Sequence, residues 1–302
     1  MNQKENIFLG ILLLLTLLIW SSAFTAIHIG LSSFDPANLA ILRYLIASFV
    51  LLLYGKYKNI SFPDFKDLPI IAVCGFLGVT VYHLTLNHGE TLVSAGTASI
   101  ISNSYPIFVA VLSAIFLKEK VCLTKWTGIT ISFLGILVIT LGSGNGINLS
   151  FGALLILISS IASGFHTIIG KKLMEKYSPL EITCYIIWAG TFFLLFFGKS
   201  LFADVATASK DAVYSVLYLG VFPGAFAYLA WNKVLAKGSA TDLTNTQNVI
   251  PIFALVISFL FLREVPTTIM ITGGTVAIGG ILIVNYSEQL KQFAYRYIDR
   301  SK

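Results

Sequence analysis

The sequence contains few charged residues. Lys, Arg, Asp and Glu together make up 11% of its 302 residues, whereas a water-soluble domain averages roughly 25%. Hydrophobic residues make up 56% of the chain, in runs that approach the ~20 residues needed to cross a bilayer as a helix. An ordinary water-soluble fold is therefore excluded. The runs also lack the two-residue alternation of membrane β-strands, so we expect an all-α membrane protein.

Cysteine and metal-binding motifs are scarce as well. The three cysteines show no C-x-x-C spacing and the four histidines no H-x-x-x-H spacing, so we expect neither a metal centre nor another cofactor. No cluster of nucleophile and base stands out, which argues against a membrane-embedded enzyme. No loop is long enough for a soluble receptor or scaffold domain, and no ring of like charges predicts a channel. The net charge of +6 lies in short loops, so no nucleic-acid partner is expected.

What the sequence does contain is an internal repeat. The segment Ser94–Leu137 returns, shifted by 145 residues, as Ser239–Leu282, and Pro106 falls on Pro251. Such a chain is built from two copies of one unit, and duplicated membrane units are typical of secondary transporters, with the substrate bound where the copies meet. We expect a first unit over residues 6–142, a linker over 143–150, a second unit over 151–285 and a basic tail over 286–302.

Ten membrane-spanning helices are predicted from the apolar runs and the turn residues between them. They cover residues 6–27, 36–54, 68–88, 95–117, 124–142, 151–171, 180–198, 212–233, 240–262 and 267–285. With alternate loops on alternate sides, the side of the N-terminus receives 16 of the 20 Lys and Arg residues and the other side 3, while Arg43 lies inside a span. This bias predicts that both termini are cytoplasmic. Five helices per unit is an odd number, so the second unit is inverted relative to the first.

Polar side chains form a stripe on one face of the fourth predicted helix, with the spacing i, i+3, i+4 and i+7. The stripe consists of Ser99, Ser102, Asn103 and Pro106, and its repeat-equivalent in the ninth helix of Thr244, Gln247, Asn248 and Pro251. Such side chains either line a substrate cavity or hold helices together; their number and two-fold placement favour a cavity. Each proline removes a backbone hydrogen bond near mid-membrane, so both helices are expected to kink.

Other polar and aromatic residues within the spans are candidates for the same cavity. They are Trp20, Ser21, Ser22, Tyr82, Asn87, Trp188, Tyr228, Trp231 and Asn232. Asn87 and Asn232 occupy repeat-equivalent positions in the third and eighth helices. Aromatic residues are also typical of the membrane–water interface, which is the alternative position for them.

Ionisable residues inside the spans are rare, and the clear ones are Arg43, His83 and His166. A charge at this depth is costly and usually faces the protein interior. Arg43 can bind a substrate carboxylate or phosphate, or it can bind carbonyls at a helix end. The histidines can carry a coupling proton, or they can be neutral hydrogen-bonded residues. No carboxylate is apparent at mid-depth, which favours exchange or facilitated movement over obligate proton coupling.

The chain resembles the EamA branch of the drug/metabolite transporter superfamily. The segment IWSSAFTAIHIGL resembles the WGSNF signature of its first helix, and ILRYLIASFVLLLY resembles the LRF signature of its second. The segments SYPIFVAVLSAIFLKEKVCLTKWTGITISFLGILVI, AYLAWNKVLAKG and VIPIFALVISFLFLREVPTTIMITGGTVAIGGILI resemble its fourth to fifth and eighth to tenth helices. The resemblance extends over about residues 7–285, in both halves.

The resemblance implies ten helices in two inverted units, a central substrate cavity and cytoplasmic termini. Members of this branch move amino acids and other small metabolites across bacterial inner membranes, so the implied partners are a small-molecule substrate and the lipid bilayer. We expect a permease for an amino acid or a related small polar compound that works by alternating access. The alternative with the same fold is an exporter of drugs or toxic metabolites. Direction, coupling ion and the choice between monomer and homodimer stay open.

Overall fold

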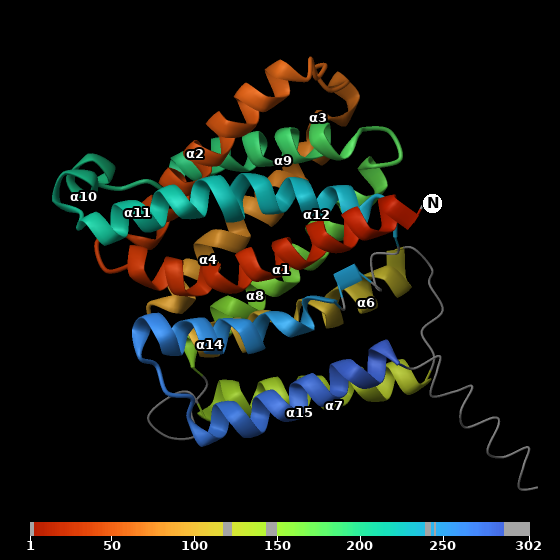
Figure 1. The fold of residues 1–302 in the computed structure, drawn as a ribbon, viewed down its shortest axis with the longest axis vertical. Coiled ribbons are helices and arrows are strands. Elements are labelled where there is room, and N and C mark those ends of the chain that lie inside the picture. The colour runs from red at the N-terminus through yellow and green to blue at the C-terminus, as the bar shows by residue number, and fades with distance from the viewer. Residues whose placement is uncertain (1–2, 117–122, 143–149, 239–242, 245, 287–302) are drawn as a thin grey trace, which may run out of the picture.

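The protein is folded almost entirely into helices, which run roughly side by side in one bundle (Figure 1). The computed structural model describes residues 3–116, 123–142, 150–238, 243–244 and 246–286, and it has no β-strand within these ranges. The prediction of an all-α membrane fold is confirmed. Apart from residues 150 and 286, the predicted linker and the predicted basic tail lie outside the described residues.

The helices of the first half follow the predicted spans closely. Two long helices come first, α1 (Gln3–Gly30) and α2 (Pro36–Tyr57). The short turn η1 (Phe65–Asp67) then leads into one continuous rod made of α3 (Leu68–Gly75), η2 (Phe76–Val81) and α4 (Tyr82–Glu90). The next rod is divided into α5 (Ala95–Ser102) and α6 (Tyr105–Phe116), and α7 (Leu123–Gly142) completes the half.

The second half repeats this order with one addition. Its first helices are α8 (Phe151–Leu173) and α9 (Pro179–Leu194), the latter extended by η3 (Leu195–Phe197). The addition is the short helix α10 (Leu201–Thr207), which precedes a rod of α11 (Lys210–Leu219), η4 (Gly220–Ala227) and α12 (Tyr228–Leu235). The chain ends, within the described residues, with η5 (Thr246–Val249), α14 (Ile250–Leu262) and α15 (Thr268–Asn285).

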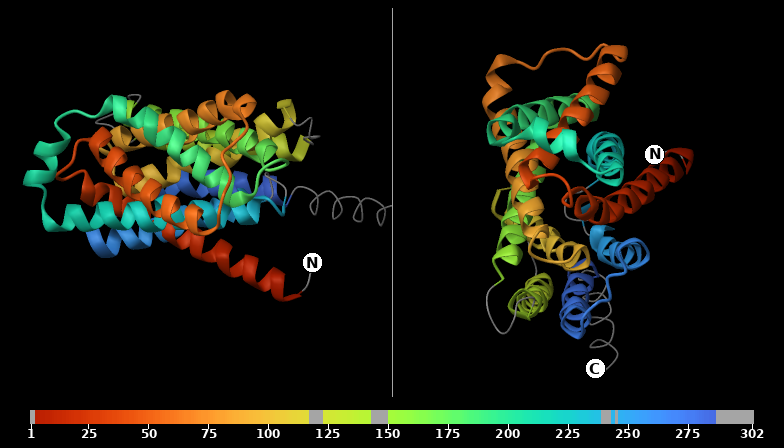
Figure 2. Two further views of the ribbon diagram at one scale, coloured as in Figure 1. Left: turned by 90° about the horizontal axis from the view of Figure 1, so that it is seen from above. Right: turned by 90° about the vertical axis from the view of Figure 1, so that its left-hand side faces the viewer.

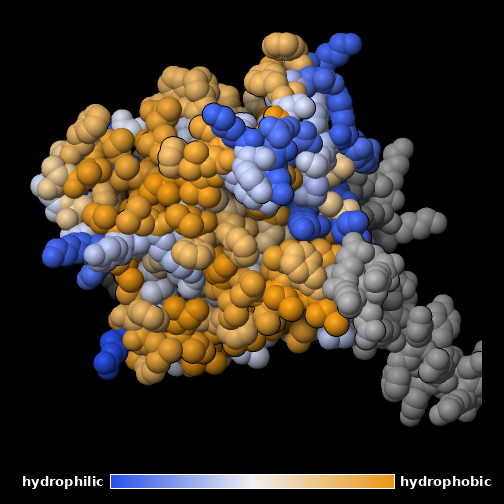
Figure 3. Space-filling view, turned by 45° about the horizontal axis from the view of Figure 1, so that its top comes forward, coloured by the Kyte–Doolittle hydropathy of each residue, from blue (hydrophilic) through white to orange (hydrophobic). Residues whose placement is uncertain are grey.

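Seven helical rods in the described ranges are long and apolar enough to cross a membrane. Three shorter apolar helices cover residues 123–138, 246–262 and 268–280. These three coincide with the fifth, ninth and tenth predicted spans, so the total of ten crossings stays a prediction. The exposed side chains agree with a bilayer environment: Figure 3 shows a broad hydrophobic surface, with hydrophilic residues gathered mainly in the upper right of the view and in smaller groups at its left.

Several helices begin at a residue whose side chain accepts a hydrogen bond from the first turn. The hydroxyls of Ser94, Ser150 and Ser209 accept from the amides of Thr97, Ala153 and Ala212. Ser178 forms a full capping box with Glu181, ahead of a proline in the first turn of α9. Each such cap contributes about 1 kcal/mol to helix stability, and caps of this kind fix where the rods start.

The two prolines of the polar stripes lie at breaks between helical segments. Pro106 is the second residue of α6 and Pro251 the second residue of α14, positions where a missing amide proton costs no helical hydrogen bond. Asn103 and Ser104 form the turn between α5 and α6. Pro106 has no amide proton to donate to the carbonyl of Ser102, four residues earlier. This carbonyl instead accepts a 3.3 Å hydrogen bond from the hydroxyl of Ser160 in α8.

Wide helical turns occur at matching places in the two halves. The stretches η2 and η4 are both π-helical, and a shift of 145 residues superimposes most of one on the other. A π-turn inserts a residue into the helix and so changes the direction of the side chains that follow. Here those side chains are Tyr82 and His83 after η2, and Tyr228 after η4.

The helices α7 and α15 pack along each other at the lower edge of the bundle (Figure 1). A Cβ atom at Gly135 would lie 2.4 Å from the amide nitrogen of Ala277, and one at Gly280 would lie 2.3 Å from that of Ser132. Since these two contacts are exchanged by the 145-residue shift, the pair has local two-fold symmetry. The glycines therefore allow close backbone packing between helices of one chain.

Candidate functional site

A cavity of about 90 Å³ lies in the middle of the bundle. Its walls come from both halves, namely from α1, α2, α4, α5, α6, α8, α12, η5 and α14, together with the turn at Asn103. Eleven of the residues proposed from the sequence line it: Trp20, Arg43, Tyr82, His83, Ser99, Ser102, Asn103, His166, Tyr228, Trp231 and Gln247. Residues predicted from far-apart segments are thus brought to one place.

Arg43 is the cationic group of this cavity. Its side chain comes from α2, is 2% exposed, and has its Nε atom without a hydrogen-bond partner in the described part of the chain. Nη1 lies 3.4 Å from Nδ1 of His83, and the guanidinium lies 5.3 Å from the ring centre of Tyr44. No carboxylate among the described residues forms an ion pair with it. The cavity therefore offers an unneutralised positive charge.

His83 is held by hydrogen bonds and aromatic contacts on several sides. Because a guanidinium only donates, Nδ1 accepts from Arg43, which assigns the ring proton to Nε2. Nε2 is hydrogen-bonded to the hydroxyl of Tyr44 and lies 3.5 Å from that of Tyr228. The ring of Tyr82 packs against it edge-on at 4.5 Å. His83 consequently orients Arg43 and links α2, α4 and α12 at the cavity wall.

His166 has a separate anchor. Its Nδ1 atom donates a 3.2 Å hydrogen bond to the carbonyl of Cys74 in α3 and lies 3.4 Å from the sulfur of the same residue. The ring fits against the backbone at Gly78, where a Cβ atom would lie only 2.0 Å from Nδ1. The absence of a side chain at Gly78 is thus what lets this histidine reach the cavity.

Two repeat-equivalent pairs meet at the centre. Nδ2 of Asn103 donates to Oδ1 of Asn248 at 3.5 Å, and the two residues are 145 positions apart. The contact between His83 and Tyr228 has the same separation of 145. A local two-fold axis therefore passes close to the cavity.

The polar stripes reach the cavity only in part. Ser99, Ser102, Asn103 and Gln247 line it, while Asn248 lies behind Asn103 and Thr244 is buried away from it. The hydroxyl of Ser102 has no hydrogen-bond partner among the described residues, and neither does Nδ2 of Asn248. Unused donors and acceptors therefore remain at and beside the cavity.

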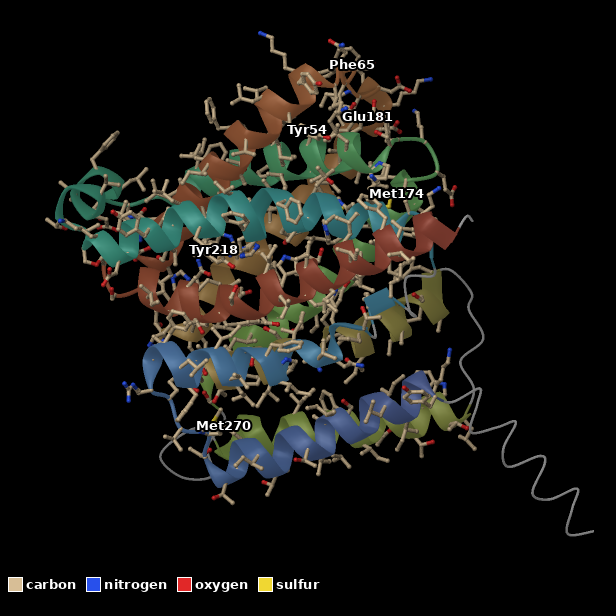
Figure 4. The ribbon with its side chains drawn as sticks, viewed as in Figure 1. Tyr54, Phe65, Met174, Glu181, Tyr218 and Met270 are labelled. Atoms are coloured by element: carbon tan, nitrogen blue, oxygen red, sulfur yellow. The ribbon has the colours of Figure 1, made fainter. Side chains whose placement is uncertain are left out.

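Three other candidates hold helices together instead of lining the cavity. The hydroxyl of Ser22 lies 2.5 Å from that of Tyr218, which faces α1 from α11 (Figure 4). Nδ2 of Asn87 donates to the carbonyl of Pro36 at 2.9 Å, and Nδ2 of Asn232 donates to Thr183 at 2.8 Å. These hydrogen bonds join neighbouring helices, and none of the three residues is among those that line the cavity.

Several lining residues were not proposed from the sequence. They are Ala23, Phe24, Ile27, Leu86, Tyr105, Ser163, Thr167 and Ile250. Ser163 and Thr167 flank His166 on one face of α8, a spacing that could have indicated them. Trp231 packs on Trp20 at 5.4 Å, and Tyr228 packs on Trp20 at 5.6 Å. An aromatic cluster therefore forms one wall.

Comparison with known proteins places the chain among transporters. A model of the EamA-like transporter family matches it twice, at residues 8–141 and 150–286. It is 38% identical over 263 residues to the uncharacterized transporter YdfC of Bacillus subtilis (strain 168), covering 87% of this chain and 86% of that one.

A second relative carries a more specific name. The chain is 34% identical over 273 residues to a probable terminal-alkyne amino-acid exporter of Streptantibioticus cattleyicolor, covering 90% of this chain and 92% of that one. A solved crystal structure with 14% sequence identity superimposes with a TM-score of 0.66, over 91% of this chain and 95% of the other. That likeness concerns the fold alone.

Proposed function

From the premise that the chain belongs to the EamA-like transporter family, we propose that it carries an amino acid or a related small polar metabolite across the membrane. The substrate occupies the central cavity, and the two halves expose that cavity to one side and then to the other. Both termini lie in the cytoplasm, as the distribution of Lys and Arg predicts.

The observation that carries this proposal is Arg43, a buried guanidinium without an acidic partner among the described residues. Leaving such a charge unpaired in a low-dielectric interior is costly. A substrate carboxylate would neutralise it through a two-pronged hydrogen bond. Anionic or zwitterionic substrates are therefore favoured over lipophilic cations.

The other walls fit the remaining parts of an amino acid. The oxygens of Asn103, Ser102 and Gln247 can accept hydrogen bonds from an ammonium group, while the rings of Trp20 and Trp231 offer an apolar surface to its side chain. Such a site is mostly apolar with a few placed polar groups, as is usual for small-molecule pockets. The name of the amino-acid exporter among the relatives agrees with this substrate class.

The local two-fold symmetry supports alternating access. Inverted repeats allow each half to adopt the conformation of the other, so that a central site opens on either side in turn. The contacts between Asn103 and Asn248 and between His83 and Tyr228 lie close to the local two-fold axis that relates the two halves. The halves would exchange conformations about this axis.

A second candidate is export of drugs or toxic metabolites. It is favoured by the aromatic wall of Trp20, Tyr228 and Trp231, which suits larger apolar compounds. The unpaired Arg43 distinguishes the two proposals, because it would repel lipophilic cations.

A thermal-shift screen of the purified protein tests the substrate class. Amino acids should raise the unfolding temperature, and amines that lack the carboxylate should not; a ligand at 100 times its Kd stabilises by about 2.7 kcal/mol. Arg43→Gln should abolish these shifts, whereas the exposed Arg263→Gln should keep them. Equal shifts with amines, or with Arg43→Gln, would contradict carboxylate recognition by Arg43.

A further inference from the structure

A second pocket, of about 620 Å³, lies at the end of the bundle where α1 finishes. We call it the end pocket; it is lined among others by His28, Glu90, Thr97, Glu264 and Met270. Figure 4 labels Met270 at this end, near the start of α15. Figure 2 shows the N-terminus at the opposite end of α1. The orientation predicted from the charges therefore makes the end pocket extracytoplasmic.

Glu90 is an unpaired carboxylate in the wall of this pocket. The third helix was expected to end at residue 88, which would have left Glu90 in a loop, but α4 continues to Glu90. Its side chain is 1% exposed, and neither carboxylate oxygen has a hydrogen-bond partner within the described ranges. No ion pair of Glu90 is found there either. A carboxylate in this setting requires a bound cation or a proton.

The charged and titratable groups around Glu90 do not supply that cation. Glu264, which follows α14 and also lines the pocket, accepts hydrogen bonds from the amides of Ala95 and Gly96 at 3.2 Å each, so each of its carboxylate oxygens already has a partner. His28 of α1 has its Nδ1 atom buried and without a partner among the described residues. The charge of Arg43 in α2 acts on Glu90 without forming an ion pair.

The helix α8 packs against this part of α4 without adding a charge. Gly89 approaches it so closely that a Cβ atom there would lie 2.5 Å from the Ile156 side chain and 2.9 Å from the carbonyl of Gly152. In the repeat, the position equivalent to Glu90 is Leu235, which is also buried. An apolar residue therefore packs well at this position in the second half. Packing alone does not explain why the first half has a carboxylate there.

Glu90 also lies directly beyond the central cavity. Tyr82, Leu86 and Glu90 are four residues apart and so share one face of α4; the first two line the central cavity and the third lines the end pocket. On α1, Ile27 lines the central cavity and His28 the end pocket. The buried side chains of Ile27 and Leu86 therefore separate the two spaces, and Glu90 is about one helical turn, roughly 6 Å of rise, past this layer.

We propose that Glu90 is a proton-binding site, filled from the end pocket, whose protonation is coupled to the change of access at the central cavity. The coupling rests on the function proposed above; the proton site itself does not. A proton passes reversibly between water in the end pocket and a carboxylate oxygen of Glu90, and no electrons are exchanged. His28 lies in the wall of the same pocket. Among the described residues, no three His, Cys, Asp or Glu side chains could together hold a metal ion, so a proton suits the site better than a divalent cation. The proposal departs from the sequence-based expectation, which favoured exchange or facilitated movement over obligate proton coupling.

Infrared difference spectroscopy on the purified protein tests the proton site without any substrate. Spectra are compared between about pH 5 and about pH 9, a range in which unperturbed carboxyl groups are mostly ionised. The wild type should show the carbonyl band of one buried protonated carboxyl group. Glu90→Gln should lack it, and Glu175→Gln, which alters an exposed carboxylate, should keep it. Identical spectra for the wild type and Glu90→Gln would overturn the proposal.

Transport in proteoliposomes tests the coupling, with a radiolabelled amino-acid mixture as the probe. Wild-type uptake should change several-fold when the pH on the end-pocket side alone is varied over the same range. Glu90→Gln and Glu90→Leu should lose this dependence, and Glu90→Asp should retain it. Two neutral variants are used so that the test can still be made if one of them does not assemble in the membrane. A wild-type pH response in both neutral variants would refute the coupling. If the wild type moves no amino acid, the proposed function fails, whereas the infrared titration still decides whether Glu90 holds a proton.

Discussion

Replacing Gly78 with Ala should displace His166 from the central cavity. A Cβ atom at residue 78 would lie 2.0 Å from Nδ1 of His166 and 2.3 Å from its Cγ. Cγ is the ring atom attached to the rest of the side chain, so bending only the far end of the ring cannot relieve the clash. The imidazole must rotate away and give up its hydrogen bond to the carbonyl of Cys74.

The loss of stability in Gly78→Ala can be worked out from these contacts. A buried carbonyl that loses its partner costs about 1–3 kcal/mol, and forcing the side chain off its rotamer costs about 0.5–1.5 kcal/mol. Alanine recovers up to ~1 kcal/mol relative to glycine inside a helix. We therefore expect Gly78→Ala to lower the free energy of unfolding by about 0.5–3.5 kcal/mol, and to weaken substrate binding because His166 lines the cavity.

Denaturant unfolding in mixed micelles measures the free energy of unfolding of Gly78→Ala. Gly170→Ala in α8 is the matched control. The nearest atoms to a Cβ at Gly170 are 3.9 Å away, so that variant should be neutral or slightly stabilised. In a His166→Ala background the penalty of Gly78→Ala should shrink, since the clash is removed. The reasoning is refuted if Gly78→Ala is as stable as Gly170→Ala, or if its penalty is unchanged without the histidine.

Three other tests concern orientation, packing and the loop ion pairs. In a cysteine-free background, a cysteine in the linker 143–150 should react with an impermeant thiol reagent outside intact cells and Lys172→Cys should not; the opposite pattern would reverse the orientation. Asn232→Leu should lower the free energy of unfolding by about 0.5–1.5 kcal/mol with unchanged ligand affinity, because the Thr183 hydroxyl loses the hydrogen bond that it accepts from Nδ2 and keeps only its own donation to the carbonyl of Pro179; lost affinity at unchanged stability would return Asn232 to the substrate site. Hydrogen bonds to Asp64 and Asp67 raise the pKa of Lys176, so its contribution to stability is complete below about pH 10 and lost as pH rises through the raised pKa. At neutral pH Lys176→Gln should therefore reduce the unfolding temperature slightly, and an effect that persists in high salt would contradict this exposed ion pair.

The fold was largely predictable because bilayer spanning leaves a strong signal in sequence. Long apolar runs, turn residues such as Asp35-Pro36 and Ser178-Pro179, and the 145-residue repeat all coincide with features of the structure. The helix end at Glu90 was missed because the apolar run stops before His88, Gly89 and Glu90, and glycine is a weak helix former. That error of two positions concealed the most unusual carboxylate of the described chain.

The candidate site was predictable only in part. Arg43, His83 and Asn103 stood out because polar groups are rare in apolar spans. Asn87 and Asn232 have the same chemistry, yet they point towards neighbouring helices. Which face of a helix meets the cavity depends on its rotation against all its neighbours, and the π-turns in η2 and η4 change that rotation without a recognisable residue pattern. Sequence spacing alone could not separate the two groups.

Counterflow of a radiolabelled amino-acid mixture in proteoliposomes tests the central claim, that the cavity around the Asn103–Asn248 pair is the transport site. Asn103→Leu and Asn248→Leu should each abolish counterflow while the proteins still assemble as monodisperse species in detergent. Val111→Ala, at a residue of α6 outside the cavity lining, should retain it. Wild-type counterflow by both asparagine variants would contradict the account and leave the polar stripes with a packing role alone.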